Sequence, residues 1–94
     1  MFLVIIHYKK PLEIVDQFVG LHREYLNKHY DNNSFIVSGP RNPREGGVML
    51  SQLKNKKDLM EIIRNDPYSI NDVADYEVIE FNPVKYHKDF EGFL

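Results

Sequence analysis

The sequence predicts an α+β domain in which four antiparallel β-strands carry two helices on one face. Strand-like apolar segments occur at residues 2–9, 34–38, 47–53 and 76–81. Helical patterns at 11–30 and 56–65 separate the first strand from the second and the third from the fourth. The length of 94 residues allows one domain with one modest core. The order β-α-β-β-α-β is that of the ferredoxin-like, split βαβ arrangement.

The first strand is apolar on both faces, which is typical of a strand at the centre of a sheet. Its side chains alternate between two faces, one with Phe2, Val4, Ile6 and Tyr8 and the other with Leu3, Ile5 and His7. Helices cover one face, but a chain this short hardly supplies a second layer for the other. We therefore expect a homodimer in which two sheets pair face to face.

The pattern at 11–30 predicts one helix opened by Pro11, whose fixed φ suits a first turn. Steps of three, four and seven residues place on one side Leu12, Val15, Phe18, Val19, His22, Tyr25, Leu26 and His29. His22 lies near the middle of this apolar stripe. A buried imidazole is costly unless it finds a hydrogen-bond partner. His22 is therefore the first candidate for a functional role.

The second half of the chain carries clear turn and cap signals. Gly39-Pro40 ends the second strand, and the loop at 40–47 holds two prolines, two glycines and two arginines. Asn55 is a candidate N-cap for the helix at 56–65. Asp66-Pro67 predicts a second N-cap with a first-turn proline, followed by a short helical turn.

The chain divides into a domain at 1–83 and a tail at 84–94. The tail is too apolar to remain free in water, with Tyr86, Phe90, Phe93 and Leu94. We expect it to dock on its own chain or on a partner chain.

Composition excludes several classes of protein. A net charge of −2 argues against a nucleic-acid binder, which usually needs a basic stripe. Without cysteine there are no disulfides and no thiolate metal sites. No apolar run approaches the roughly 20 residues of a membrane-spanning helix, and the apolar start lacks the basic residues of a signal peptide. We expect a soluble, cytoplasmic protein without a membrane partner.

An acid–base pair of His22 and Asp66 is the main catalytic hypothesis. Imidazole titrates near neutral pH, and a carboxylate on its second nitrogen fixes the tautomer and stabilises the imidazolium. Both helices lie on one face of the predicted sheet, so contact between these residues is sterically reasonable. The alternatives are a core histidine bonded to a backbone carbonyl and an aspartate that only caps a helix.

Further candidates surround this pair. Ser38 is a candidate for binding a substrate oxygen, Tyr8 and Tyr68 for donating phenolic hydrogen bonds, and Arg41, with Arg44, for holding an anion. Each has a plainer alternative as a strand-end, packing or solvated residue. No metal site is expected, because His22 and His29 are about 10.5 Å apart along a helix. The sequence has no phosphate-binding glycine loop either, and we expect no cofactor.

The ordered set of motifs resembles the YCII-related (YciI-like) family over about residues 2–86. The motifs are Phe2-Leu3-Val4-Ile5, Leu21-His22-Arg23-Glu24-Tyr25-Leu26, Ser38-Gly39-Pro40, Asn42-Pro43-Arg44, Gly46-Gly47-Val48, Asp66-Pro67-Tyr68 and Tyr76-Glu77-Val78-Ile79-Glu80-Phe81. The resemblance implies a dimeric α+β barrel with a histidine–aspartate pair in a cleft, at His22 and Asp66, and with Ser38 beside them. At least one branch of the family resembles a dehydrochlorinase that acts on a chlorinated hydroxyquinol. The extended tail departs from the family pattern.

Three functional hypotheses remain open at this point. The first is a cofactor-independent enzyme, of lyase or hydrolase type, that acts on a small hydroxylated or aromatic metabolite. The second is a non-catalytic domain that binds a small ligand or a partner protein. The third is a purely structural oligomer in which Asp66 is only a cap.

Overall fold

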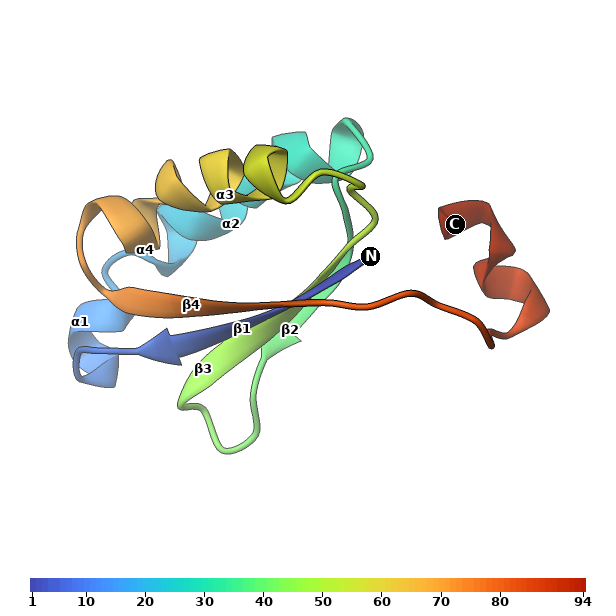
Figure 1. The fold of residues 1–94 in the computed structure, drawn as a ribbon. Helices are drawn as coiled ribbons and strands as arrows, with labels where there is room; N and C mark the ends of the chain where they lie inside the picture. The colour runs from blue at the N-terminus through green and yellow to red at the C-terminus, as the bar shows by residue number, and fades with distance from the viewer.

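The computed structural model describes all 94 residues as one four-stranded antiparallel sheet in the order β2-β3-β1-β4. The strands are β1 (Phe2–Tyr8), β2 (Phe35–Pro40), β3 (Gly46–Ser51) and β4 (Ala74–Glu80). The helices are α1 (Leu12–Val15), α2 (Val19–Asp31), α3 (Lys56–Arg64), α4 (Pro67–Ile70) and the 3₁₀ helix η1 (Lys88–Phe93). Figure 1 shows α2, α3 and α4 together on one face of the sheet. The predicted ferredoxin-like α+β fold is confirmed.

The central position of β1 agrees with its two apolar faces. It pairs with β3 on one side and β4 on the other, so that Ile6 lies between Gly47 and Tyr76. On the helix side, Phe2, Val4 and Ile6 are buried in the core. Burial of such side chains contributes about 1.5–3 kcal/mol each to folding.

Gly46 allows the close approach of β3 to β1. A Cβ atom at this position would lie 1.7 Å from the carbonyl oxygen of Ile6. Only glycine therefore fits here, and the loop before β3 depends on it to meet the central strand.

The prediction of one helix over 11–30 is wrong. The structure has the short helix α1, a tight turn at residues 16–18, and then α2. In that turn the N–H of Gln17 donates to Ile14 and that of Phe18 to Val15, both three residues back. The break buries Val15 and leaves Leu12 43% exposed, although both belong to the predicted stripe. The sequence has no Gly or Pro at 16–18 to mark it.

The other predicted elements are present with shifted ends. The second and third strands run over residues 35–40 and 46–51, and the fourth begins two residues earlier than predicted, at Ala74. Such end shifts are usual where strand pairing, and not local pattern, decides where a strand stops.

The face of the sheet away from the helices is open and largely apolar, with the exposed pair of His7 and Glu77 at one end. On it, Val37, Val48 and Ile79 are 57%, 38% and 40% exposed, and Leu3 and Ile5 are half-buried. We call this set the open face. Sheet faces of this kind normally pack against a second layer. No helix of the structure has the length and apolar character needed to span a membrane.

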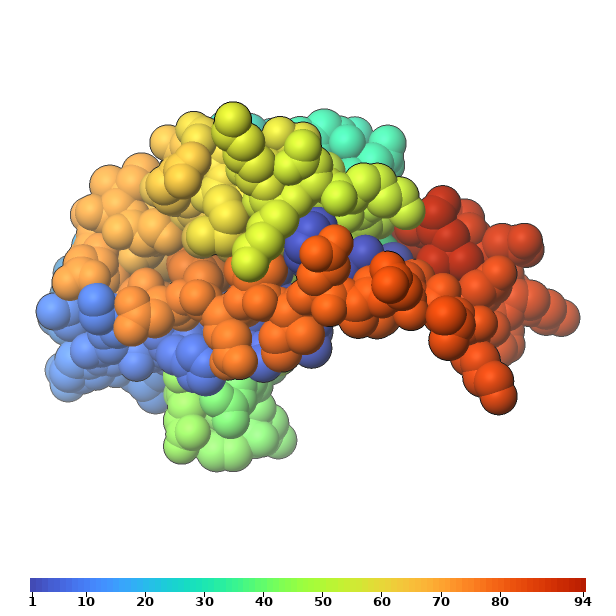
Figure 2. All heavy atoms as spheres, in the orientation of Figure 1, coloured from blue at the N-terminus to red at the C-terminus, as the bar shows by residue number.

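The tail continues from β4 past the end of the sheet and carries η1 (Figure 1). In Figure 2 its atoms project beyond the body of the molecule. Its own hydrogen bonds, such as that from the N–H of Phe90 to His87, all lie within the tail. The rings of Phe90 and Phe93 pack on each other at 5.3 Å, whereas Val84 is 84% exposed. That the tail docks on a chain stays a prediction.

Candidate active site

His22 and Asp66 lie in direct contact although 44 residues separate them in the chain. Nδ1 of His22 is 2.9 Å from Oδ1 and 2.8 Å from Oδ2 of Asp66. His22 is 8% exposed and Asp66 1%. An ionised carboxylate can only accept hydrogen bonds, so Nδ1 of His22 carries the hydrogen and donates it, and Nε2 is left as the acceptor.

The local sequence fixes Asp66 in this position. As predicted, it is the N-cap of α4, with Pro67 as the first helical residue. Its Oδ1 accepts the backbone N–H of Tyr68 at 2.9 Å. The cap bond holds the carboxylate rigidly, and α4 lies against α2, which carries His22. The capping and the histidine-binding roles of Asp66 are therefore combined in one side chain.

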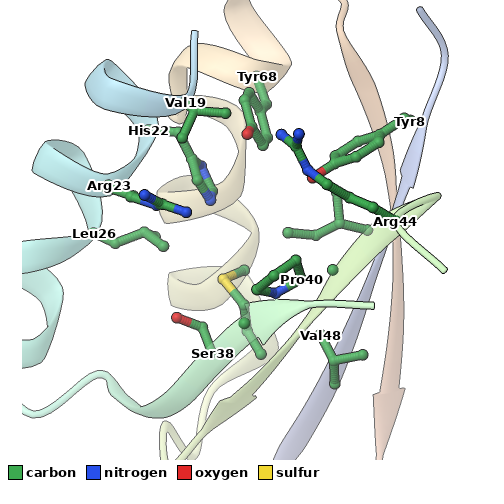
Figure 3. Close-up of a pocket in the computed structure, with 14 residues that line it drawn as sticks. Tyr8, Val19, His22, Arg23, Leu26, Ser38, Pro40, Arg44, Val48 and Tyr68 are labelled. Carbon is green, nitrogen blue, oxygen red and sulfur yellow. The ribbon is translucent and has the colours of Figure 1, made fainter. Parts of the chain in front are cut away.

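A cavity of about 210 Å³ opens beside the ring of His22, between α2, α4 and the sheet. Figure 3 shows side chains from these elements converging on it. Its lining consists of Ile6, Tyr8, Val19, His22, Arg23, Leu26, Ser38, Gly39, Pro40, Arg44, Gly47, Val48, Met49 and Tyr68. A cavity of about 150 Å³ is enough to hold benzene. This one has room for a single substituted ring.

Both predicted tyrosines line the cavity. The phenol ring of Tyr68 stacks on the imidazole of His22, with centroids 4.0 Å apart and planes 5° apart. Tyr8 meets Tyr68 edge to face at 6.1 Å. Burial, and then the neighbouring Tyr8, raise the pKa of Tyr68 well above its ordinary value. Its hydroxyl therefore stays protonated at neutral pH.

Ser38 also lines the cavity, from the strand β2. Its Oγ is 2.5 Å from the hydroxyl of Tyr30, which comes from the end of α2. Tyr30 itself does not line the cavity. The pair ties the edge strand to the helix that carries His22 and fixes the direction of the Ser38 hydroxyl.

The structure places Arg41 outside the cavity lining and brings Arg44 and Arg23 into it. Arg44 is bonded to Asp16 at 2.5 Å and lies 5.8 Å above the ring of Tyr8. Arg23, next to His22 in the sequence, was not among the predicted site residues. Successive helix residues are about 100° apart around the axis, so Arg23 lies at the edge of the apolar stripe that contains His22. That position is the one feature of the sequence that could have indicated a role for Arg23 in the site.

Two buried polar atoms near this region have no hydrogen-bond partner, the hydroxyl of Tyr76 and Nε2 of His29. Burial and the negative charge of Asp66 raise the pKa of Tyr76. Burial lowers the pKa of His29, and Lys28 lowers it further. Nowhere in the chain do three or more His, Asp or Glu side chains come together in an arrangement that could hold a metal ion.

Comparison with known proteins identifies the family. One similar solved structure is the 5-chloro-2-hydroxyhydroquinone dehydrochlorinase (TftG) from Burkholderia phenoliruptrix AC1100, in complex with 2,5-dihydroxybenzoquinone. It is 16% identical, covers 87% of this chain and 94% of its own, and superposes with a TM-score of 0.72, which shows a shared fold. No curated protein matches in sequence. The family model of the YCII-related domain matches residues 1–82. The chain therefore belongs to the YCII-related domain family.

Proposed function

We propose that the protein is an enzyme that moves a proton on a small hydroxylated ring compound, with His22 as general base and acid. The observation that carries this proposal is the contact of His22 Nδ1 with both oxygens of Asp66. It leaves Nε2 free to take a proton from a molecule in the cavity. The Asp66 carboxylate then stabilises the imidazolium that forms.

The reaction class follows from what a single base can start. His22 first takes a proton from a ring hydroxyl at Nε2 and returns it to the ring carbon that bears the leaving group, which gives the keto tautomer with that carbon tetrahedral. Removal of a proton from a second ring hydroxyl then lets the electron pair left behind form a ring double bond and expel the leaving group as an anion from the tetrahedral carbon. The net change is loss of H⁺ and of that anion, which is a lyase reaction. The similar structure named a dehydrochlorinase supports this class. Proton transfer of this kind commonly contributes about 10²–10⁴ in rate.

The other lining groups suit a planar hydroxylated ligand. Tyr68, stacked on His22, offers a protonated phenol, and Ser38 offers a second hydroxyl. Aliphatic side chains such as Leu26 and Met49 complete an apolar wall. Sites for small molecules typically combine an apolar lining with a few polar groups of this kind.

The test uses 5-chloro-2-hydroxyhydroquinone as probe and follows chloride release together with the mass of the organic product. We expect turnover by the wild type, loss of turnover in His22→Gln, and retention in His87→Gln, which changes an exposed tail histidine in the same way. Conversion that persists in His22→Gln contradicts the proposal. A probe that binds but is recovered unchanged favours a ligand-binding domain.

We further propose that two copies of the chain pair through the open face. The five side chains of this set are apolar, His7 and Glu77 pair with each other beside them, and a two-fold axis brings the same patch of each copy together. The tail at 84–94 would then have a second chain within reach. A stable pair needs about 800 Å² buried on each copy, which a four-stranded sheet face can supply.

A further inference from the structure

Arg23 is an exposed cationic side chain that lines the cavity and has no acidic partner. Of the four arginines, Arg44 pairs with Asp16 and Arg64 with Glu61, while Arg23 and Arg41 have no side-chain partner. Arg23 lines the cavity and Arg41 does not. Figure 3 shows the guanidinium of Arg23 reaching into the cavity beside the ring of His22.

The charges around the cavity are unbalanced. None of its lining residues is acidic, whereas two are arginines. The nearest buried carboxylate, Asp66, lies behind the His22 ring and is engaged by Nδ1 and by the N–H of Tyr68. Asp16 offsets the charge of Arg44 only. The chain as a whole carries a net charge of −2, so the positive cavity is a local feature.

The remaining lining restricts the shape of the ligand. The aliphatic side chains of Ile6, Leu26 and Met49 and the ring of Pro40 form apolar walls. With about 210 Å³ of space, the cavity holds one ring and its substituents. An anion bound here would therefore have its charge on a ring substituent near Arg23 and its ring against these walls.

We propose that the ligand of this cavity is an anion, a single-ring compound with an ionised oxygen, and that Arg23 binds that oxygen. A planar guanidinium pairs well with a carboxylate or an ionised ring oxygen. Its charge also lowers the pKa of an acidic hydroxyl placed beside it. The inference rests on the proposed function for the place of the ligand beside His22 Nε2, but binding does not require turnover.

The test compares two probes of similar shape, the anion 2,5-dihydroxybenzoate and the neutral 2,5-dihydroxybenzamide. Dissociation constants are measured by calorimetry at fixed pH and salt for the wild type, Arg23→Gln and Arg41→Gln. The last variant removes the same charge from an unpaired arginine outside the cavity. We expect the wild type to bind the anion at least about tenfold more tightly, a preference worth about 1.4 kcal/mol. Arg23→Gln should lose most of that preference and Arg41→Gln should keep it.

Several results overturn the proposal. They are equal affinity of the wild type for the two probes, no detectable binding of either, a preference that survives in Arg23→Gln, or a preference that Arg41→Gln loses equally. His22→Gln separates this proposal from the proposed function, because it should keep the preference for the anion even though it abolishes turnover. Retention of turnover in His22→Gln would contradict only the catalytic role.

Discussion

Both carboxylate oxygens of Asp66 lie within hydrogen-bond distance of Nδ1 of His22, at 2.9 and 2.8 Å. Oδ1 of Asp66 also accepts a hydrogen bond from the backbone N–H of Tyr68, in the first turn of α4. The capping bond and the histidine bond differ in one respect that matters. Capping needs only a neutral oxygen acceptor, whereas stabilising an imidazolium needs a negative charge. A substitution that keeps the oxygen and removes the charge separates the two roles.

Asp66→Asn should keep the fold and lose activity. Asparagine caps as well as aspartate, so we expect the free energy of unfolding to change by less than about 2 kcal/mol. The amide places a donor against Nδ1 and removes the charge, so kcat/KM should fall by about 10²–10⁴. Urea unfolding and steady-state kinetics measure the two effects. A fully active variant would mean that Asp66 is only a cap.

The bond between Tyr30 and Ser38 gives a matched pair of variants. Ser38→Ala and Tyr30→Phe both remove this hydrogen bond, at a cost of about 0.5–1.5 kcal/mol in stability. Only Ser38→Ala also removes a hydroxyl that faces the cavity. We therefore expect similar melting temperatures for the two variants but a higher KM for Ser38→Ala alone. An equal KM in both variants would show that Ser38 acts only in tying β2 to α2.

Much of this site could be predicted because its signals are local. An imidazole on an apolar stripe needs a partner, and Asp66-Pro67 marks a cap whose carboxylate is fixed in space. The alternation of strand residues and the order of elements together gave the sheet. These features depend on neighbours in the sequence, or on rules that hold for any chain with this order of elements.

The missed features depend on tertiary packing. The turn at 16–18 has no Gly or Pro, and it forms because Val15 packs in the core while Asp16 meets Arg44 from a distant loop. Arg23 lies at the border of the apolar stripe, and only the packing of α2 on β2 makes that border the wall of a cavity. Which of Arg41 and Arg44 lines the cavity depends on the path of the loop that carries both, and the composition of the loop does not determine that path.

Stability should fall as the pH drops below the ordinary pKa of histidine, because of His29. Burial lowers the pKa of His29 from 6.5, and Lys28 lowers it further, against a smaller opposing effect of Asp66. Below pH 6.5 the unfolded chain takes up a proton that the folded chain refuses. The unfolded state then binds more protons, so stability declines with falling pH, by at most about 1.4 kcal/mol per pH unit for this one group.

Urea unfolding of the wild type, His29→Leu and His87→Gln from pH 7.5 to 5.5 measures this effect. Leucine keeps an apolar contact with Tyr25 and Phe35, which pack on His29, and cannot take up a proton. We expect a flatter decline for His29→Leu and an unchanged one for His87→Gln, which alters an exposed tail histidine. An identical decline in His29→Leu would assign the acid sensitivity to other groups.

A lysine on the open face should separate the proposed dimer. Val48 is 38% exposed on β3 and lies beside Ile5. It borders the cavity, but Figure 3 shows its side chain directed away from the cavity and from the helices. In a pair of stacked sheets, Val48→Lys would place an ammonium group between apolar layers, which costs several kcal/mol.

Ile70→Lys is the control, because Ile70 is 66% exposed on α4, on the helix side of the sheet. Light scattering should give the wild type and Ile70→Lys twice the chain mass of 11.1 kDa and Val48→Lys that of one chain. Dissociation of Ile70→Lys, or a wild type that stays monomeric, would contradict pairing through this face.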